Sequence, residues 1–110
     1  MVKTIYNILR INAGSDFSKS FDILALNGSP FELTDWIPTC QFRKDYTSRS
    51  AVSATCSKTS DQITIELSSE QTFELDKWSY VFDIQISNSS TGMTLKPING
   101  VAYIDNGVTR

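Results

Sequence analysis

The sequence predicts an all-β protein, an antiparallel sandwich of two sheets with roughly seven to eight strands and one short helical turn. Apolar and polar side chains alternate along most of the chain, which is the two-residue period of a half-buried strand. Turn residues interrupt this alternation about every 8–12 residues, a spacing typical of sandwiches. The 110 residues, of which 40% are hydrophobic and 20% charged, suit one core. Residues 1–110 are therefore expected to form a single β-sandwich domain.

Each expected strand is a run in which the apolar side chains fall on one face. The segment "QITIELS" shows this most simply, because Ile63, Ile65 and Leu67 alternate with polar side chains. In "FSKSFDILAL" and "AVSATCS" the apolar faces begin at Phe17 and Val52. The expected strands, in chain order, are residues 3–11, 17–26, 36–44, 51–57, 62–68, 77–87 and 93–105.

Prolines and glycines indicate where these strands begin, bend or end. Pro38 has no amide hydrogen, so the strand at 36–44 is expected to begin late or to lie at a sheet edge. Gly28 follows an asparagine and tolerates a positive φ, which predicts a turn. Pro97 and Gly100 are expected to break the last segment into two strand pieces or to mark a β-bulge.

The strand at 77–87 has the clearest alternation, and a helical turn is expected just before it. Ser68 lies three residues before Gln71, which is the spacing of a capping box, so a short helical turn should close one end of the sheet. In "KWSYVFDIQIS" every second residue is large and apolar. The side chains expected to fill the core are Phe21, Phe42, Ile65, Trp78, Tyr80, Phe82 and Ile84.

Charge and the N-terminal sequence indicate the compartment of the protein, and the compartment bears on its two cysteines. The formal net charge is −2, so no overall field attracts DNA or an anionic membrane. The first residues hold neither a signal-peptide apolar region nor a run of about 18 apolar residues, so the mature protein is expected to begin near Met1 and to fold in a cytoplasm. Cys40 and Cys56 are expected to be buried free thiols; a disulfide between them is the lesser alternative.

The sequence carries no signature of an enzyme, a metal site or a cofactor. Histidine is absent, which excludes Ser-His-Asp and Cys-His arrangements and most catalytic zinc sites. No glycine loop of the phosphate-binding kind occurs, and the carboxylates are scattered. Asp83, between Phe82 and Ile84, is expected to be an outward polar residue of its strand. We expect a non-enzymatic protein with no catalytic, metal-binding or cofactor-binding residues.

The segment "QFRKDYTSRSAV", residues 41–52, is the most basic part of the chain. Arg43, Lys44 and Arg49 with Tyr46 could clamp a phosphate and stack a base. Asp45 lies among them, however, and no second basic stripe exists, so a solvated surface turn is the favoured interpretation.

A sugar-binding module is a further alternative, because exposed aromatic side chains on a sandwich can stack on glycans. The candidates are Trp36, Tyr46, Trp78, Tyr80 and Tyr103. The strand period assigns Trp78 and Tyr80 to the core, which leaves Tyr46 in its loop as weak evidence for such a site.

Several segments together resemble small Ig-like β-sandwich virion proteins of tailed bacteriophages, of the tail and baseplate type and similar to the N-terminal domains of baseplate and receptor-binding proteins. "DFSKSF", "ELTDW" and "RKDYTSRSA" in the first half resemble that family's strand, turn and loop motifs. "ITIELSSEQTFELDKWSYVFDIQIS" and "PINGVAYIDNGVTR" continue the resemblance to the end of the chain. Two departures are Asp35, where a glycine is usual, and Asn106-Gly107, where Pro-Glu is usual. The matching residues are Asp16, Phe17, Ser18, Phe21, Glu32, Leu33, Thr34, Trp36, Arg43, Lys44, Tyr46, Ser48, Ala51, Gly100, Val108, Thr109 and Arg110.

The resemblance implies an Ig-like fold and a structural role in a virion that is assembled in the cytoplasm of the host bacterium. The expected function is that of a tail or baseplate subunit that contacts other virion proteins in a multimeric assembly, with fibre attachment as one form of it and without nucleic-acid or membrane binding. Arg43, Lys44, Tyr46 and Arg49 are the candidate subunit contacts. A capsid decoration protein and a glycan-binding adsorption module remain as alternatives.

Overall fold

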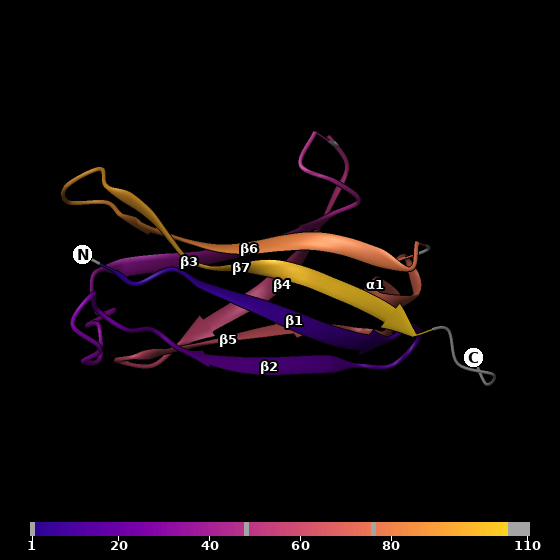
Figure 1. The fold of residues 1–110 in the computed structure, drawn as a ribbon, viewed down its shortest axis with the longest axis horizontal. Helices are drawn as coiled ribbons and strands as arrows, with labels where there is room; N and C mark the ends of the chain where they lie inside the picture. The colour runs from indigo at the N-terminus through magenta and orange to yellow at the C-terminus, as the bar shows by residue number, and fades with distance from the viewer. Residues whose placement is uncertain (1, 48, 76, 106–110) are drawn as a thin grey trace.

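A computed structural model describes residues 2–47, 49–75 and 77–105, so Ser48 and the terminal residues 106–110 of the family resemblance lie outside the described residues. The described chain forms strands separated by turns, with one short helix, as the alternation predicts (Figure 1). The elements are β1 (Ile5–Asn12), β2 (Phe17–Asp22), β3 (Trp36–Arg43), β4 (Ala51–Lys58), β5 (Gln62–Leu67), α1 (Ser69–Phe73), β6 (Ser79–Asn88) and β7 (Thr94–Asp105).

The strands make two layers that share one strand. Hydrogen bonding follows the order β1-β7-β6-β3-β4-β5-β2. The first half of β4 pairs with β3, from Ala51 to Ala54, and its second half pairs with β5, from Thr55 to Lys58. β4 therefore crosses diagonally from one layer to the other (Figure 1). One layer is β1-β7-β6-β3, and the other is β5-β2.

One strand pair departs from the antiparallel arrangement that the sequence predicts. β1 runs parallel to β7 without a break in register, from Ile5 opposite Ile98 to Asn12 opposite Asp105. Before β1, Val2 forms a bridge with Ala25, which follows β2 in the opposite layer. The chain thus begins beside one layer and crosses to the other. Parallel pairing with β7 is possible because the long connection through β2 to β6 separates the two strands, which a tight hairpin could not do.

Six of the seven expected core side chains are buried. Phe42, Ile65 and Ile84 are fully enclosed, and Phe21, Tyr80 and Phe82 are at most 5% exposed. The Phe82 ring stacks on the Phe42 ring at 5.4 Å between centroids and lies 6.4 Å from the Phe21 ring. Because Phe21 belongs to β2 and the other two to β3 and β6, this aromatic cluster joins the two layers.

Trp78 is the exception, because its side chain is 71% exposed rather than buried. β6 begins one residue later, at Ser79, so the strand period does not extend back to Trp78. The residue lies in a bend, where the alternation of faces no longer fixes the direction of a side chain. Its ring packs on the outside of the sheet against Tyr103, at 5.7 Å between centroids.

The structure also tests the local signals at turns and caps. The Ser68 hydroxyl accepts a hydrogen bond from the Gln71 amide and the Gln71 side chain accepts one from the Ser68 amide, so the predicted capping box is confirmed. Asp35 lies in a turn closed by a hydrogen bond from the Trp36 amide to the Leu33 carbonyl, 3.0 Å long. Among the described residues no side-chain-bearing residue has a positive φ, so this turn does not require glycine.

β3 begins at Trp36, so the expected late start at Pro38 is wrong, and the expected edge is correct only for the first residues of the strand. Pro38 pairs with Ile86 of β6, whereas the pairing of β3 with β4 begins only at Cys40, so the Pro38 segment has no β4 partner. The last strand is continuous, and the bulge alternative is the correct one. Lys96 and Pro97 together face the single residue between Ile84 and Ile86, where the register shifts.

Candidate interaction surface

The loop between β3 and β4, which we call the basic loop, is a surface turn, as the sequence predicts. β3 ends at Arg43 and β4 begins at Ala51, and the described residues between them are exposed. One Asp45 carboxylate oxygen accepts hydrogen bonds from the Thr47 amide and the Thr47 hydroxyl, at 2.9 and 2.8 Å, which closes a local turn. In Figure 1 this loop projects away from the sandwich. Such a shape can present side chains to a partner.

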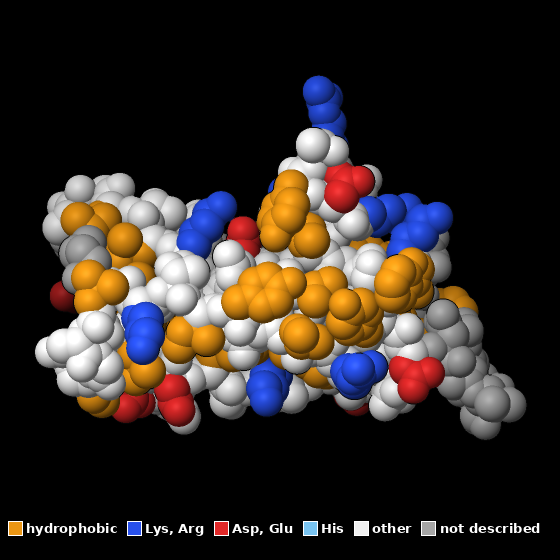
Figure 2. Space-filling model, in the orientation of Figure 1, with side chains coloured by type: hydrophobic (Ala, Val, Ile, Leu, Met, Phe, Trp, Pro, Cys, Tyr) orange, Lys and Arg blue, Asp and Glu red, His pale blue; other side chains and the backbone are white. Residues whose placement is uncertain are grey.

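A larger feature lies below this loop, on the outer side of the β1-β7-β6 layer. Figure 2 shows hydrophobic side chains gathered there, with Lys and Arg side chains around them. The strand register explains the cluster, because Ile8, Val101 and Val81 lie opposite one another on three adjacent strands. We call this surface the apolar face. Its members are Tyr6, Ile8, Tyr46, Trp78, Val81, Val101 and Tyr103.

Two members of the apolar face, Tyr6 and Ile8, are exposed side chains of β1. Ile8 is 60% exposed and Tyr6 is 62% exposed, although both lie within a regular strand. Exposed apolar side chains are ordinary when they are scattered, but a contiguous group of them typically marks a binding surface. The apolar face is such a group.

Three side chains at one end of this face form a stack. Trp78 and Tyr103 are nearly parallel, with 24° between the ring planes, and the Arg10 guanidinium carbon lies 5.7 Å from the Tyr103 ring centroid. Arg10 and Tyr103 lie opposite each other in the register of β1 and β7. Asn12 and Asp105 complete a shallow hollow around the stack. This arrangement combines flat apolar surface with hydrogen-bonding groups at its margin.

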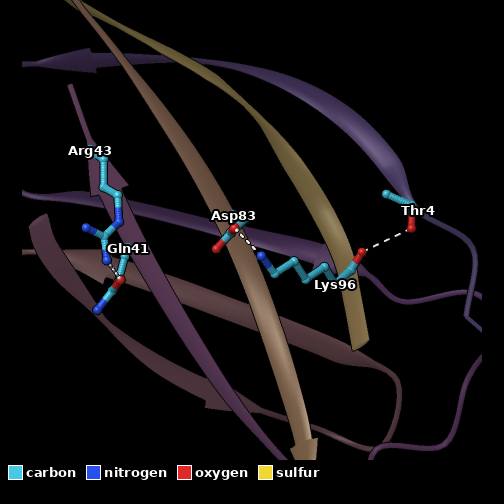
Figure 3. A network of polar contacts seen from close by, with 5 residues as sticks. All are labelled: Thr4, Gln41, Arg43, Asp83 and Lys96. Atoms are coloured by element: carbon cyan, nitrogen blue, oxygen red, sulfur yellow. Dashed lines mark hydrogen bonds and ion pairs between the residues drawn. The ribbon is translucent and has the colours of Figure 1, made fainter. Parts of the chain in front are cut away.

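A polar strip borders the other end of the apolar face (Figure 3). The Lys96 ammonium lies 3.4 Å from the Asp83 carboxylate, and the backbone carbonyl of Lys96 accepts a hydrogen bond from the Thr4 hydroxyl, 3.0 Å long. The Arg43 guanidinium donates to the Gln41 side-chain oxygen at 2.7 Å. Asp83 is thus an outward polar residue, as predicted. Because the ion pair is largely exposed, it adds only about 0–1 kcal/mol to stability.

The four predicted contact residues do not all reach the apolar face. Arg43 and Tyr46 share a hollow with Val81 and Asp83, which places them at its margin. Lys44 instead lines a separate hollow with Tyr80. Arg49 is exposed in the loop, and it lines neither of the two hollows described at the apolar face.

Sequence reasoning missed most of the apolar face. A signal was present in "KTIYNILRI", where Tyr6 and Ile8 are apolar on one phase while Leu9 and Ile11 are apolar on the other. A strand that is apolar on both phases predicts burial on one side and an apolar exposed or contacting surface on the other. The structure shows Leu9 and Ile11 facing the core.

The described residues show neither a metal site nor a membrane-spanning helix. No three side chains of the metal-ligating types gather within residues 2–47, 49–75 and 77–105. None of the helical segments in these ranges is long and apolar enough to cross a membrane.

Both cysteines are free, as expected, but only Cys40 is buried as predicted, because Cys56 is half-buried. Burial raises the pKa of the Cys40 thiol strongly, and the nearby Cys56 and Asp83 side chains raise it further. Burial also raises the pKa of Cys56, which is only half-buried. Since the thiolate is the reactive form, both thiols should react slowly in the folded protein, and Cys40 more slowly than Cys56.

We predict that a thiol reagent modifies Cys56 before Cys40 under native conditions. Labelling Cys40→Ser and Cys56→Ser variants separately measures each thiol on its own by mass spectrometry. The difference in rate should vanish in denaturant, where both thiols are solvated. A native rate for Cys40 that equals that of Cys56 would contradict the burial of Cys40.

Comparison with known proteins supports the fold and gives no further identity. No protein-family model matches the chain, and no curated protein matches it. Among solved structures, the crystal structure of the titin M3 domain is similar, with a TM-score of 0.52 and 7% sequence identity over 96% of both chains. At this level of identity the similarity establishes the Ig-like sandwich fold alone.

Proposed function

We propose that this protein is a non-enzymatic structural subunit of a tailed-bacteriophage virion, in its tail or baseplate, and that it contacts neighbouring protein subunits through the apolar face. The apolar face is the observation that carries the proposal of a protein contact. The assignment to a virion tail depends on the motif resemblance of residues 15–110.

The composition of the apolar face suits a protein partner. Interface cores are enriched in Tyr, Trp and Arg and poor in Lys and Glu, and a few such residues carry most of the binding free energy. The Trp78–Tyr103–Arg10 stack supplies these residue types in a fixed arrangement. Because the rings already pack against each other, little side-chain entropy remains to be lost when a partner covers them.

The virion assignment is tested by quantitative mass spectrometry of purified particles whose heads and tails have been separated. The proposal requires the protein in the tail fraction, at a small and fixed copy number. If the protein follows the heads at a copy number set by the capsid lattice, the capsid decoration alternative replaces the tail assignment. Its absence from both fractions would overturn the virion role.

We predict that Trp78→Ser strongly reduces incorporation into particles and leaves the melting temperature nearly unchanged. Trp78 is 71% exposed, so its removal costs little core packing but takes the largest ring from the apolar face. Ile37→Ser is a matched control, since Ile37 is 60% exposed on the outer side of β3 and does not belong to the apolar face. Arg49→Glu tests the loop in the same assay. Normal incorporation of Trp78→Ser would remove the apolar face from the contacts.

One observation favours a glycan-binding module as the second candidate. The exposed Trp78 ring, backed by Tyr103, lies beside Arg10, Asn12 and Asp105, which could stack on a sugar ring and bind its hydroxyl groups. The sequence assigned Trp78 to the core and so left this alternative weak. Titration of the purified protein with a panel of bacterial surface oligosaccharides, followed by Trp fluorescence, tests it. A saturable change that Arg10→Ala abolishes, with the Trp78 fluorophore still in place, would favour the adsorption module.

A further inference from the structure

β1 forms one end of the hydrogen-bonded strand order and pairs with β7 along its whole length. We propose that its other edge pairs with β1 of a second copy of this chain, antiparallel and centred on Ile8. The two β1-β7-β6-β3 layers would then form one continuous sheet. This inference rests on the proposed role in protein contacts and names one partner, the chain itself.

The two ends of the strand order differ in how they are protected against such pairing. β2, at the other end, carries three consecutive exposed polar residues, Ser18, Lys19 and Ser20. A lysine at a sheet edge opposes pairing, because a second strand would bury its charge. Just after β2, the Leu24 carbonyl already accepts a hydrogen bond from the Lys3 amide, 2.8 Å long.

β1 lacks most of the usual devices that protect an edge strand, and Arg10 is its one charged residue. Its sequence, "IYNILRIN", contains no proline and no lysine, and its register with β7 has no bulge over eight residues. Within the described residues, no backbone hydrogen bond outside the strand ladders involves residues 5–11 of β1. The nearest ones are at its end, where the Ala13 amide donates to the Asp105 carbonyl and the Ser15 amide donates to the Asn12 carbonyl. The exposed side chains Tyr6 and Ile8 are apolar. A long, regular, apolar edge is a template for another strand.

The sequence of β1 is complementary to itself when two copies run antiparallel about Ile8. Ile8 then lies opposite Ile8 of the second copy, and Tyr6 lies opposite Arg10. This register separates the two Arg10 charges and places each guanidinium beside an aromatic ring, a favourable cation–π contact of about 0.5–1 kcal/mol at exposed sites. Arg10 already makes such a contact with Tyr103 within its own chain.

The geometry of this pairing also limits the assembly to two copies. An antiparallel pair of identical strands has a two-fold axis, which gives a closed dimer. Pairing of β1 with β2 of another copy would instead be head-to-tail and would grow without closing, and Lys19 opposes it. In the two-fold dimer the apolar faces of both copies meet at Ile8, so that a third component could bind one wide surface.

The test measures the association state of purified full-length variants by sedimentation over a wide concentration range. Wild type should convert from monomer to dimer, with a twofold rise in weight-average mass. Ile8→Asp and Ile8→Lys should each remain monomeric, because like charges would face each other across the two-fold axis. An equimolar mixture of the two should regain the dimer, because opposite charges then face each other.

Matched controls are Ile37→Asp and Ile37→Lys, since Ile37 has the same 60% exposure as Ile8 and lies on an outer strand position. They should dimerise like wild type. A wild type that stays monomeric at every concentration overturns the proposal, as do charged Ile8 variants that still dimerise. A mixture that stays monomeric overturns the register centred on Ile8. The Trp78→Ser incorporation assay is independent, so it can fail or succeed separately from this result.

Discussion

Replacement of Phe82 by alanine should lower the free energy of unfolding by about 3–5 kcal/mol, which is the range for truncating a buried aromatic side chain. The Phe82 side chain is 2% exposed and packs against Phe42 and Phe21. Since Phe21 belongs to the opposite layer, the cavity would open between the two sheets, where neither backbone can easily collapse into it.

Denaturation by urea, followed by Trp fluorescence, measures this loss, and Phe73→Ala is the matched control. Phe73 is the same residue type but is 57% exposed at the end of α1, so its truncation should cost less than about 1 kcal/mol. If Phe82→Ala also cost less than about 1 kcal/mol, the phase assigned to β6 would be wrong, and Val81 or Asp83 would face the core instead.

The aromatic cluster around Phe82 joins the two layers without a covalent bond, a role that an inter-sheet disulfide has in antibody domains. Tyr80, two residues before Phe82, is also buried, and its hydroxyl accepts a hydrogen bond from the Lys77 amide, 3.2 Å long. Phe21 and Phe82 thus bridge the layers by ring packing. The sandwich is joined without a covalent bond, in agreement with its two free thiols.

The strands could be predicted because their signals are local. Alternation is read within a few residues, and the capping box at Ser68 needs only Gln71 three positions later. The same rule failed at Trp78, because the alternation in the sequence already includes Trp78, whereas β6 begins only at Ser79. The end of a strand depends on where its pairing with a neighbouring strand ends, which is not local information.

The local pattern of residues 3–11 indicated an apolar exposed strand face, but the extent of the apolar face could not be predicted because it depends on pairing between distant segments. Ile8 and Val101 are adjacent only because β1 runs parallel to β7, and the sequence favoured antiparallel pairing throughout. The loop residues Arg43, Lys44 and Arg49 were conspicuous by their charge, whereas Tyr6 and Ile8 resembled ordinary core residues. The charge of a residue can be seen from its identity alone. To predict whether an apolar side chain is exposed, one must also know which residues lie beside it on the adjacent strands.

Gly100→Ala should destabilise the protein by about 3 kcal/mol or more, at or beyond the upper end of the usual cost of overpacking. Gly100 is buried and lies opposite Asn7 in the β1–β7 register. A methyl group on Gly100 would meet the backbone of Asn7, at 2.7 Å from the carbonyl carbon and 2.9 Å from the amide nitrogen, and it would be closer still to the carbonyl oxygen. Backbone atoms in a paired strand cannot rotate aside, so β1 would have to move away from β7.

Urea denaturation again measures the loss of stability, and Gly28→Ala separates the steric clash from the general cost of replacing a glycine. Gly28 has a φ of +88°, and nothing lies within 4 Å of its added methyl group, so only the left-handed backbone penalty of about 1 kcal/mol applies. The excess for Gly100→Ala reports the contact between β7 and β1. Because Ile8 and Tyr6 depend on that contact for their position, the same variant should also lose dimerisation. Equal losses of stability for the two variants would mean that β1 does not lie against Gly100 as described.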